Sequence, residues 1–315
     1  MPDAPHILVT GGTGFVGRAI VRELIYRGHR TSVLTRDTAS RNAAELSAIG
    51  AQMVVCPSAN DISAAIRPLS LTHVLHAAAP GVKPEDRTWE RMNAGCTIYT
   101  LQLLEAVKDK GLTRFLNVGS WSEYAPPIDP DTPITEKYSL ESGNVYGAAK
   151  ASAFLSGQAF SIQNGIPFLS TRLFNIYGPG EAQTRLIPYV ITQLMKNESV
   201  DLTPGLQERD FVFISDAAAA LCDMLLTDKT LDHSVYNVCS GVGTSVRKMV
   251  EIAADTLKAD KALLNFGARP YRPDEPLRVT GSPDRLASTM GWSARTPVED
   301  GVRALTHDLV RLIGR

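Results

Sequence analysis

Three residues in the middle of the chain have the types and spacing of a proton-transfer site. Tyr146 and Lys150 belong to the segment YGAAK, and four-residue spacing on a helix places both side chains on one face. Ser120 precedes them and directly follows a strand-like stretch, FLNVGS. The Lys150 ammonium would stabilise the phenolate form of Tyr146, and Ser120 would hydrogen-bond the reacting oxygen. We therefore predict Ser120, Tyr146 and Lys150 as catalytic residues.

A glycine-rich segment near the start of the chain has the pattern of a phosphate-binding turn. Residues 10–17 read TGGTGFVG, directly after the strand-like run HILVT and at the start of a helical pattern. Glycines permit a tight turn and a close backbone approach to a pyrophosphate, and the helix N-terminus adds N–H donors and partial positive charge. We predict a bound dinucleotide, and its expected contacts in this turn are Gly11, Gly14, Phe15, Val16 and Gly17.

The end of the second predicted strand bears on the choice between NAD and NADP. An Asp or Glu there would hydrogen-bond the ribose 2′-hydroxyl of NAD. The strand ends instead in Thr35 and Arg36, whose hydroxyl and guanidinium can both bind a 2′-phosphate. NADP(H) is the preferred cofactor, and NAD(H) is the alternative if Arg36 only stacks on adenine or points to solvent. Asp61 and Ile62, after the third strand, suit a contact with the adenine amino group.

The elements that must position these residues alternate between short apolar runs and longer helical patterns. Continuous apolar strands are typical of a parallel sheet that is covered by helices on both faces. We predict an α/β fold, a Rossmann-type doubly wound parallel sheet with a smaller C-terminal substrate-binding domain. The predicted strands are residues 6–10, 30–35, 52–56, 72–76, 115–118 and 168–173, and the predicted helices are residues 16–27, 39–49, 62–69, 89–110 and 145–164.

The boundary between the two predicted domains lies near residue 175. Residues 1–175 are assigned to the dinucleotide-binding domain and residues 176–315 to the substrate-binding domain. Gly and Pro are frequent beyond Tyr177, which predicts loops and short elements around a pocket. Residues 211–241 are expected to return in part to the first domain, because residues 235–239 have a strand pattern. The two domains are therefore predicted to be interleaved.

Length and composition exclude several classes of protein. The 315 residues are 44% hydrophobic and 21% charged, as in an average globular protein, which argues against disorder and coiled coil. The net charge of -1 favours neither nucleic acid nor a membrane as partner. Four widely spaced cysteines without a CxxC pair indicate buried thiols in a reducing compartment, and no metal site is predicted. Because the N-terminus lacks a signal-peptide pattern and the apolar window at residues 211–226 is too short to cross a bilayer, we predict a cytoplasmic protein.

In their order along nearly the whole chain, the motifs resemble the extended short-chain dehydrogenase/reductase family. This family contains NAD(P)-dependent nucleotide-sugar epimerases, dehydratases and reductases. The motifs that carry the resemblance are TGGTGFVG, LHAAAP (75–80), Asn93, Ser120, YGAAK, TRLFNIYGPG (171–180), RDFVFISD (209–216), YNVCSG (236–241) and MGWSARTPVEDGV (290–302).

The resemblance implies roles for further residues. Ser120, Tyr146 and Lys150 align with the family's catalytic residues, and Asn93 with a helix asparagine that orders the site in related reductases. Asn93, Tyr146 and Lys150 are also expected to contact the cofactor, and Lys150 would hold the nicotinamide ribose. Asn175 and Arg209 align with residues that contact the sugar nucleotide, and an arginine is a suitable cation for a diphosphate. The further candidates are Ala77, Ala78 and Ala79 for the cofactor, and Ser122, Arg185 and Arg272 (or Asp274) for the substrate.

Departures from the family pattern narrow the reaction. The dehydratases carry an Asp-Glu pair after their catalytic Thr, whereas Trp121 and Ser122 follow Ser120, so 4,6-dehydration is not expected. Gly119 stands where a serine is usual and Ala125 where a glycine is usual, which would reshape the sugar pocket. The segments LTPGLQERDF (202–211) and NFGARPYRPDE (265–275) resemble CDP-abequose and CDP-paratose synthases. Those enzymes reduce the 4-keto group of a CDP-linked dideoxyhexulose with NADPH.

Several hypotheses for the function remain open at this stage. The leading one is an NADPH-dependent 4-ketoreductase of a nucleotide-linked deoxysugar, and the second is a nucleotide-sugar epimerase with retained NAD. A non-catalytic dinucleotide-binding sensor and a reductase of other carbonyls are the remaining two. The sequence does not identify the base or the sugar. A homodimer is expected, because helices 89–110 and 145–164 carry apolar residues beyond one face and such helices pair in relatives: Tyr99, Leu103, Phe154 and Leu155.

Overall fold

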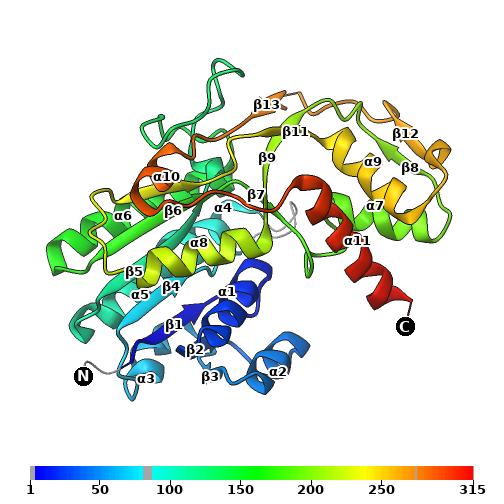
Figure 1. Cartoon of the computed structure of the whole chain (residues 1–315). Coiled ribbons are helices and arrows are strands. Elements are labelled where there is room, and N and C mark those ends of the chain that lie inside the picture. The colour runs from blue at the N-terminus through cyan, green and yellow to red at the C-terminus, as the bar shows by residue number, and fades with distance from the viewer. Residues whose placement is uncertain (1–3, 81–86, 274, 315) are drawn as a thin grey trace. The chain divides into compact units, whose positions relative to one another are not determined.

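The chain folds into two compact units in the computed structural model, which describes residues 4–80, 87–273 and 275–314 (Figure 1). Unit 1 comprises residues 1–126, 136–173 and 218–237, and unit 2 comprises residues 127–135, 174–217 and 238–315. The chain passes from one unit to the other five times, after residues 126, 135, 173, 217 and 237. Asp274, one of the alternatives for the substrate, lies outside the described residues.

Unit 1 is built on a seven-stranded parallel sheet, which confirms the predicted α/β fold class. The strand order is β10-β6-β5-β4-β1-β2-β3, so the strand predicted at residues 235–239 does join this sheet. The strands are β1 (His6–Thr10), β2 (Arg30–Thr35), β3 (Gln52–Val55), β4 (His73–His76), β5 (Arg114–Ser120), β6 (Phe168–Leu173) and β10 (Val235–Val238). The helices are α1 (Phe15–Tyr26), α2 (Arg41–Ala48), α3 (Ile62–Ile66), α4 (Trp89–Met92), α5 (Tyr99–Val107) and α6 (Val145–Asn164), with α8 (Ile214–Leu226) leading into the unit from unit 2.

The strand order reverses between β1 and β4, and this reversal indicates where along the edge of the sheet a ligand is expected to bind. Strands β2 and β3 lie on one side of β1, and strands β4, β5 and β6 on the other. In such sheets ligands bind at the carboxyl ends of the strands, in the crevice where the order reverses. The segments that follow β1 and β4 begin at this edge with Gly11 and Ala77, and β5 ends there with Ser120.

Alternating strand residues pack against helices on the two faces of this sheet. Leu8, Leu34, Val74 and Phe115 form one cluster with apolar residues of α3 and α5. Figure 1 shows α1 and α8 on the near side of the sheet. Because both faces are covered, the strands are apolar without interruption, as the five buried residues of β1 show.

The helix predicted at residues 89–110 is not a uniform α-helix. It begins as α4, continues as a π-helical stretch at Asn93–Ile98 and becomes α-helical again in α5, before a 3-10 turn at Lys108–Lys110. A π-helical stretch inside an α-helix is uncommon and often marks a functional site. Here it begins at Asn93, the residue that the resemblance singled out.

Unit 2 has a helical core of its own, contrary to the prediction of loops and short elements beyond Tyr177. Apolar residues of three helices, including Val190, Met249 and Leu305, form one buried cluster. Gly- and Pro-rich segments separate these helices and interrupt the apolar periodicity that would have indicated them. The helices are α7 (Leu186–Met195), α9 (Val246–Leu257), α10 (Asp284–Met290) and α11 (Val298–Ile313), and the strands are β7 (Asn175–Tyr177), β8 (Val200–Leu202), β9 (Glu208–Phe213), β11 (Gly243–Ser245), β12 (Leu264–Phe266) and β13 (Arg278–Val279).

Two of the apolar residues that were expected at a dimer interface are buried inside unit 1, so the prediction for these two residues is wrong. Leu103 is fully buried and Phe154 is 6% exposed. Leu155 is exposed, as expected, and Ile98 and Ile162 are further exposed apolar residues of the same two packed helical segments. Over the described residues, the structure contains no helix that is long and apolar enough to cross a membrane.

Candidate active site

The turn between β1 and α1 has the geometry that a bound pyrophosphate requires. Gly11 has φ +69°, and a Cβ atom there would lie 2.6 Å from the backbone nitrogen of Ala78. A Cβ atom on Gly17 would overlap the carbonyl oxygen of Gly11, so helix α1 can pack this closely only without a side chain. Both glycines therefore serve the close packing of the turn, as the motif predicts.

The N-terminus of α1 fits an anionic ligand. Gly14 is its N-cap and provides no side-chain hydrogen bond, and the first turn contains no acidic residue. Phe15 and Val16 are the first two helical residues, so their N–H groups belong to the donors that an α-helix leaves unpaired at its start. The partial positive charge of the helix favours a phosphate at this position.

The two residues at the end of β2 that could bind a 2′-phosphate differ in their present hydrogen bonds and exposure. The Thr35 hydroxyl donates to the carbonyl oxygen of Asp37 (2.8 Å) and accepts from the Asp37 N–H (3.4 Å). Arg36 is exposed. Arg36 is therefore the better candidate for a 2′-phosphate. Asp61 is also exposed at the end of a 3-10 turn, whereas the Ile62 side chain is buried in the core and can offer only its backbone to a ligand.

The segment after β4 is held against β1. The N–H of Ala77 donates to the Thr10 carbonyl (3.1 Å), and the N–H of Ala78 donates to the Thr10 hydroxyl (3.4 Å). Ala79 packs with Tyr146 on one apolar cluster, which also contains Met92. The structure thus brings this alanine segment, the glycine turn and the predicted catalytic tyrosine into one region of unit 1.

A buried chain of hydrogen bonds, which the sequence reasoning missed, runs below this region from His76. The Thr100 hydroxyl donates to the Cys96 carbonyl in the π-helical stretch (2.6 Å), so it accepts from Nε2–H of His76 (3.0 Å). Nδ1 of His76 then accepts from the Thr10 hydroxyl (2.6 Å). Burial, with a contribution from the Lys150 charge, lowers the pKa of His76 to about 3, so the ring stays neutral. This chain links the cofactor turn to the helix that contains Asn93.

Tyr146 and Lys150 lie on the first turns of α6, which packs against the end of β5. The Lys150 side chain is buried, and its Nζ donates to the Val118 carbonyl (2.8 Å). A Cβ atom on Gly147 would overlap the carbonyl oxygen of Ser122, so this glycine lets the helix approach the turn that follows Ser120. The guanidinium of Arg87 lies 5.0 Å from the centre of the Tyr146 ring.

Ser120 is the last residue of β5, and the 3-10 turn Trp121–Glu123 begins directly after it. The Ser120 hydroxyl donates to the Ser122 hydroxyl (3.2 Å) and accepts from the Ser122 N–H (3.2 Å). The Glu123 carboxylate accepts the Ser120 N–H (2.8 Å) and is fully buried beside Arg172. The carboxylate that this turn does contain, that of Glu123, is therefore engaged by Arg172 and by the Ser120 backbone.

Unit 2 places Asn175 and Arg209 on neighbouring strands. β7 pairs with β9, and the Asn175 amide donates to the Asp210 carbonyl (3.2 Å). The Arg209 side chain is 10% exposed, and its guanidinium donates to the Glu275 carboxylate and to the Glu208 carbonyl (2.8 Å). Burial lowers the pKa of Arg209, and Glu275 opposes this effect. The sequence reasoning missed Glu275, because no local pattern relates it to Arg209.

The two looser candidates of unit 2 are both exposed. Arg185 is the N-cap of α7, and its side chain lies 3.4 Å from the carboxylate of Glu181. Arg272 lies in the loop between β12 and β13. Its carbonyl accepts the N–H of Glu275 (3.1 Å), the residue that pairs with Arg209. Asn175, Arg209 and the Arg272 backbone therefore belong to one region of unit 2, and Arg185 has a separate acidic partner.

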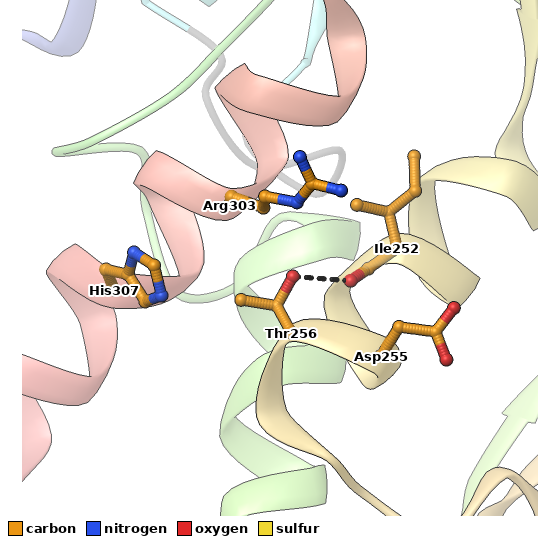
Figure 2. Close-up of a pocket in the computed structure, with 5 residues that line it drawn as sticks. All are labelled: Ile252, Asp255, Thr256, Arg303 and His307. Carbon is orange, nitrogen blue, oxygen red and sulfur yellow. Dashed lines mark hydrogen bonds between the residues drawn. The ribbon is translucent and has the colours of Figure 1, made fainter.

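A pocket of about 230 Å³ lies between α9 and α11 of unit 2 (Figure 2). Figure 2 shows that Arg303 and His307 come from α11 and Asp255 and Thr256 from α9. The Thr256 hydroxyl donates to the carbonyl of its own helix at Ile252 (2.7 Å). This pocket contains none of the predicted site residues.

Comparisons with known proteins agree with this geometry. Curated relatives include the GDP-6-deoxy-D-mannose reductase of Pseudomonas aeruginosa, 29% identical over 66% of this chain and 70% of its own. They also include the CDP-abequose synthase of Salmonella typhimurium, 24% identical over 96% of this chain and 98% of its own. The UDP-glucose 4-epimerase of Corynebacterium glutamicum is 25% identical over 96% of this chain and 94% of its own.

A similar solved structure is the UDP-glucuronic acid 4-epimerase of Bacillus cereus, in complex with UDP-glucuronic acid and NAD. It has a TM-score of 0.87 and is 22% identical over 98% of this chain and 99% of that chain, a level of identity that supports the fold alone. The sequence profile of the NAD dependent epimerase/dehydratase family matches residues 7–239. With the glycine turn, the Tyr146–Lys150 helix and the strand order all in place, this match shows that the chain belongs to the NAD dependent epimerase/dehydratase family.

Proposed function

We propose that this protein is an NADPH-dependent 4-ketoreductase of a nucleotide-linked deoxysugar. Membership of the family makes it an NAD(P)-dependent enzyme of nucleotide sugars. The proposal adds that the enzyme reduces a 4-keto group and that its cofactor is NADPH. The observation that carries it is the end of β2, where an exposed Arg36 follows Thr35 and no acidic side chain stands at the position that would bind the 2′-hydroxyl of NAD.

The chemistry that we propose needs a proton donor, a polarising group and a cation. When bound, NADPH supplies the hydride to the carbonyl carbon. Tyr146 donates its phenolic proton to the carbonyl oxygen, so that the keto group becomes a secondary alcohol. Ser120 hydrogen-bonds that oxygen. Lys150 stabilises the phenolate that Tyr146 becomes once it has donated its proton. The Lys150 Nζ already lies 2.8 Å from the Val118 carbonyl, close to the end of the strand that carries Ser120.

The other predicted contacts take supporting roles in this proposal. Arg209 is the leading cation for the substrate diphosphate, because its guanidinium already binds a carboxylate in a largely buried setting. The remaining contacts that we propose for the substrate are Ser122, Asn175, Arg185 and Arg272. Those for the cofactor are the glycine turn, Thr35, Arg36, Asp61, Ile62, Ala77, Ala78, Ala79, Asn93, Tyr146 and Lys150.

A nucleotide-sugar epimerase is the second candidate function. The Corynebacterium relative and the Bacillus structure are both named as 4-epimerases, and the Bacillus structure contains NAD. An epimerase would use Ser120, Tyr146 and Lys150 in the same places but would first oxidise the sugar carbon and then reduce it again. It would therefore keep its dinucleotide bound throughout the reaction.

The dinucleotide that the purified protein retains distinguishes the two functions. We expect little retained NAD, and NADPH oxidation with a 4-keto-6-deoxyhexose derivative of CDP, dTDP, GDP or UDP. Tightly bound NAD, together with epimerisation and no NADPH consumption, would establish the epimerase instead. Thermal shifts with these four nucleotide series would also rank the base.

The Tyr146→Phe variant tests the proton donor in the same assay. Loss of the phenolic hydroxyl should lower kcat by about 10²- to 10⁴-fold, the usual contribution of a general acid. The dissociation constant for NADPH should change little, because the phenyl ring still packs beside Ala79 and Met92. Unchanged turnover in this variant would remove Tyr146 from the mechanism and favour a non-catalytic role.

We also propose a homodimer through helix α6 and the helix at residues 89–110. Ile98, Leu155 and Ile162 are 45%, 52% and 76% exposed on these helices. Leu155 and Ile162 are seven residues apart, so they lie on one face of α6.

A cytoplasmic location, inferred from composition and cysteine usage, is part of the same proposal.

A further inference from the structure

An ion pair that no part of the proposed chemistry uses lies directly behind Ser120. Glu123 is 0% exposed and Arg172 is 2% exposed. Arg172 Nε donates to Glu123 Oε2 at 2.6 Å, and the other carboxylate oxygen accepts the Ser120 N–H at 2.8 Å. The carboxylate thus joins a buried cation to the backbone of a predicted catalytic residue.

The surroundings hold Arg172 in one orientation. Its guanidinium lies 4.6 Å from the centre of the Tyr124 ring and 4.9 Å from that of Phe154. Nη1 donates to the Tyr124 hydroxyl (3.1 Å), which donates in turn to Asn237 Oδ1 (2.7 Å). Burial raises the pKa of Glu123, and the Arg172 guanidinium opposes that rise. The partner of Glu123 is therefore a rigidly held cation and not a mobile surface group.

Gly119 makes room for this arrangement. A Cβ atom at this position would overlap Glu123 Oε1 and would lie 2.5 Å from the Thr171 carbonyl. The serine that is usual here in the family could therefore not be combined with Glu123 in its observed place. The departure from the family pattern at Gly119 thus has a structural explanation in the buried Glu123 carboxylate.

Stability is a poor explanation for such a pair. Burying two charges carries a large desolvation penalty, and well-packed apolar residues often replace a buried ion pair without loss of stability. Glu123 also completes a capping box: the Ser120 hydroxyl accepts from the Ser122 N–H while Glu123 accepts from the Ser120 N–H. This reciprocal pair of bonds fixes both the backbone and the hydroxyl of Ser120.

We propose that Glu123 and Arg172 are positioning residues that orient the hydroxyl of Ser120 toward the reacting oxygen. The inference rests on the proposed function, because it assigns the pair to the serine of that reaction. It predicts that removing the pair affects turnover only through Ser120. A displaced catalytic group can cost about a hundredfold in rate, so the effect is measurable.

A double-mutant cycle tests this dependence. In the otherwise unchanged protein, Glu123→Gln should lower kcat about tenfold or more and leave the KM for NADPH unchanged. In a Ser120→Ala background the same substitution should change kcat less than about twofold. The assay uses NADPH and the 4-keto-6-deoxyhexose derivative, of CDP, dTDP, GDP or UDP, that the unchanged enzyme reduces fastest.

Two further variants complete the design. Arg172→Lys keeps the positive charge but loses the planar fork, and it should show the same dependence on Ser120. Glu23→Gln is the matched control, because Glu23 accepts a hydrogen bond from Arg27 (2.7 Å) on α1, and it should leave kcat unchanged. NADPH affinity verifies that each variant is folded.

The outcomes separate a failure of this inference from a failure of the proposed function. If Ser120→Ala alone leaves kcat unchanged, the catalytic role of Ser120 is wrong. If Ser120→Ala lowers kcat but Glu123→Gln lowers it equally in both backgrounds, the function stands and the positioning role is wrong. Loss of NADPH binding in both Glu123→Gln and Arg172→Lys would assign the pair to folding and would also overturn the positioning role.

Discussion

Thr35 and Arg36 are both candidates for binding the 2′-phosphate of NADPH, but they are not equally available to it. The Thr35 hydroxyl has hydrogen bonds in both directions with the Asp37 backbone, so binding a phosphate there requires breaking local bonds. Arg36 is exposed and carries a permanent charge. The proposed preference for NADPH therefore depends on Arg36 much more than on Thr35.

The Arg36→Ala variant tests this assignment. Hydrogen bonds to charged groups contribute about 1.5–3 kcal/mol, so the Kd for NADPH should rise about tenfold to a hundredfold. The Kd for NADH should change little, because NADH has no 2′-phosphate. Isothermal titration with both cofactors measures the difference, and Arg67→Ala, another exposed arginine of unit 1, is the control. Equal weakening of NADH and NADPH would show that Arg36 contacts adenine and not the 2′-phosphate.

At the scale of elements, the loop that leads into α7 contains a buried acid. The Glu181 side chain is 9% exposed, and its nearest cation is the half-exposed Arg185. Burial raises the pKa of Glu181 to about 7, because the contact with Arg185 and a backbone hydrogen bond at Gly178 offset only part of the loss of solvent. The loop therefore carries a carboxyl group that changes its charge near neutral pH.

Glu181 should make the stability of the protein depend on pH. Its folded-state pKa of about 7 lies above the value of 4.5 for an unperturbed carboxyl, so the native state binds more protons between these values. The free energy of unfolding should consequently fall as the pH rises from about 4.5 to about 7. Glu181→Gln mimics the protonated form and should gain stability relative to the unchanged protein by about 2–3 kcal/mol between pH 5 and pH 8.

Urea denaturation at these two pH values, followed by circular dichroism, measures this difference. Glu198→Gln is the control, because Glu198 is an exposed acid that follows the same helix. A stability difference between Glu181→Gln and the unchanged protein that does not vary with pH would show that Glu181 is ionised throughout this range.

For the whole molecule, the exposed apolar residues of α6 bear on the proposed dimer. The double variant Leu155→Glu with Ile162→Glu should convert a dimer into a folded monomer, because two carboxylates would be buried without partners in the interface. Sedimentation velocity measures the change. Tyr26→Glu alters an 89% exposed residue of α1 and should leave the dimer intact. A monomeric unchanged protein, or a dimer that survives the double variant, would contradict the proposal.

Much of the unit 1 architecture could be predicted from local pattern. The strands at residues 6–10, 30–35 and 168–173 and the helix at residues 145–164 have the predicted bounds in the structure. Their apolar runs are long, and glycines or polar residues mark their ends, so neighbouring residues suffice to define them. In unit 2 most strands have two or three residues, and they depend on partners that are distant in the chain.

The sequence by itself determined the parts of this protein that depend on neighbouring residues. Glycine spacing after a strand specified the turn before α1, and four-residue spacing on a helix placed Tyr146 and Lys150 on one face. The tertiary structure alone decided which charged groups pair: Glu123 with Arg172, and Arg209 with Glu275. The partners of these pairs are far apart in sequence, and burial raises the cost of leaving either one unpaired, so only the folded chain selects them.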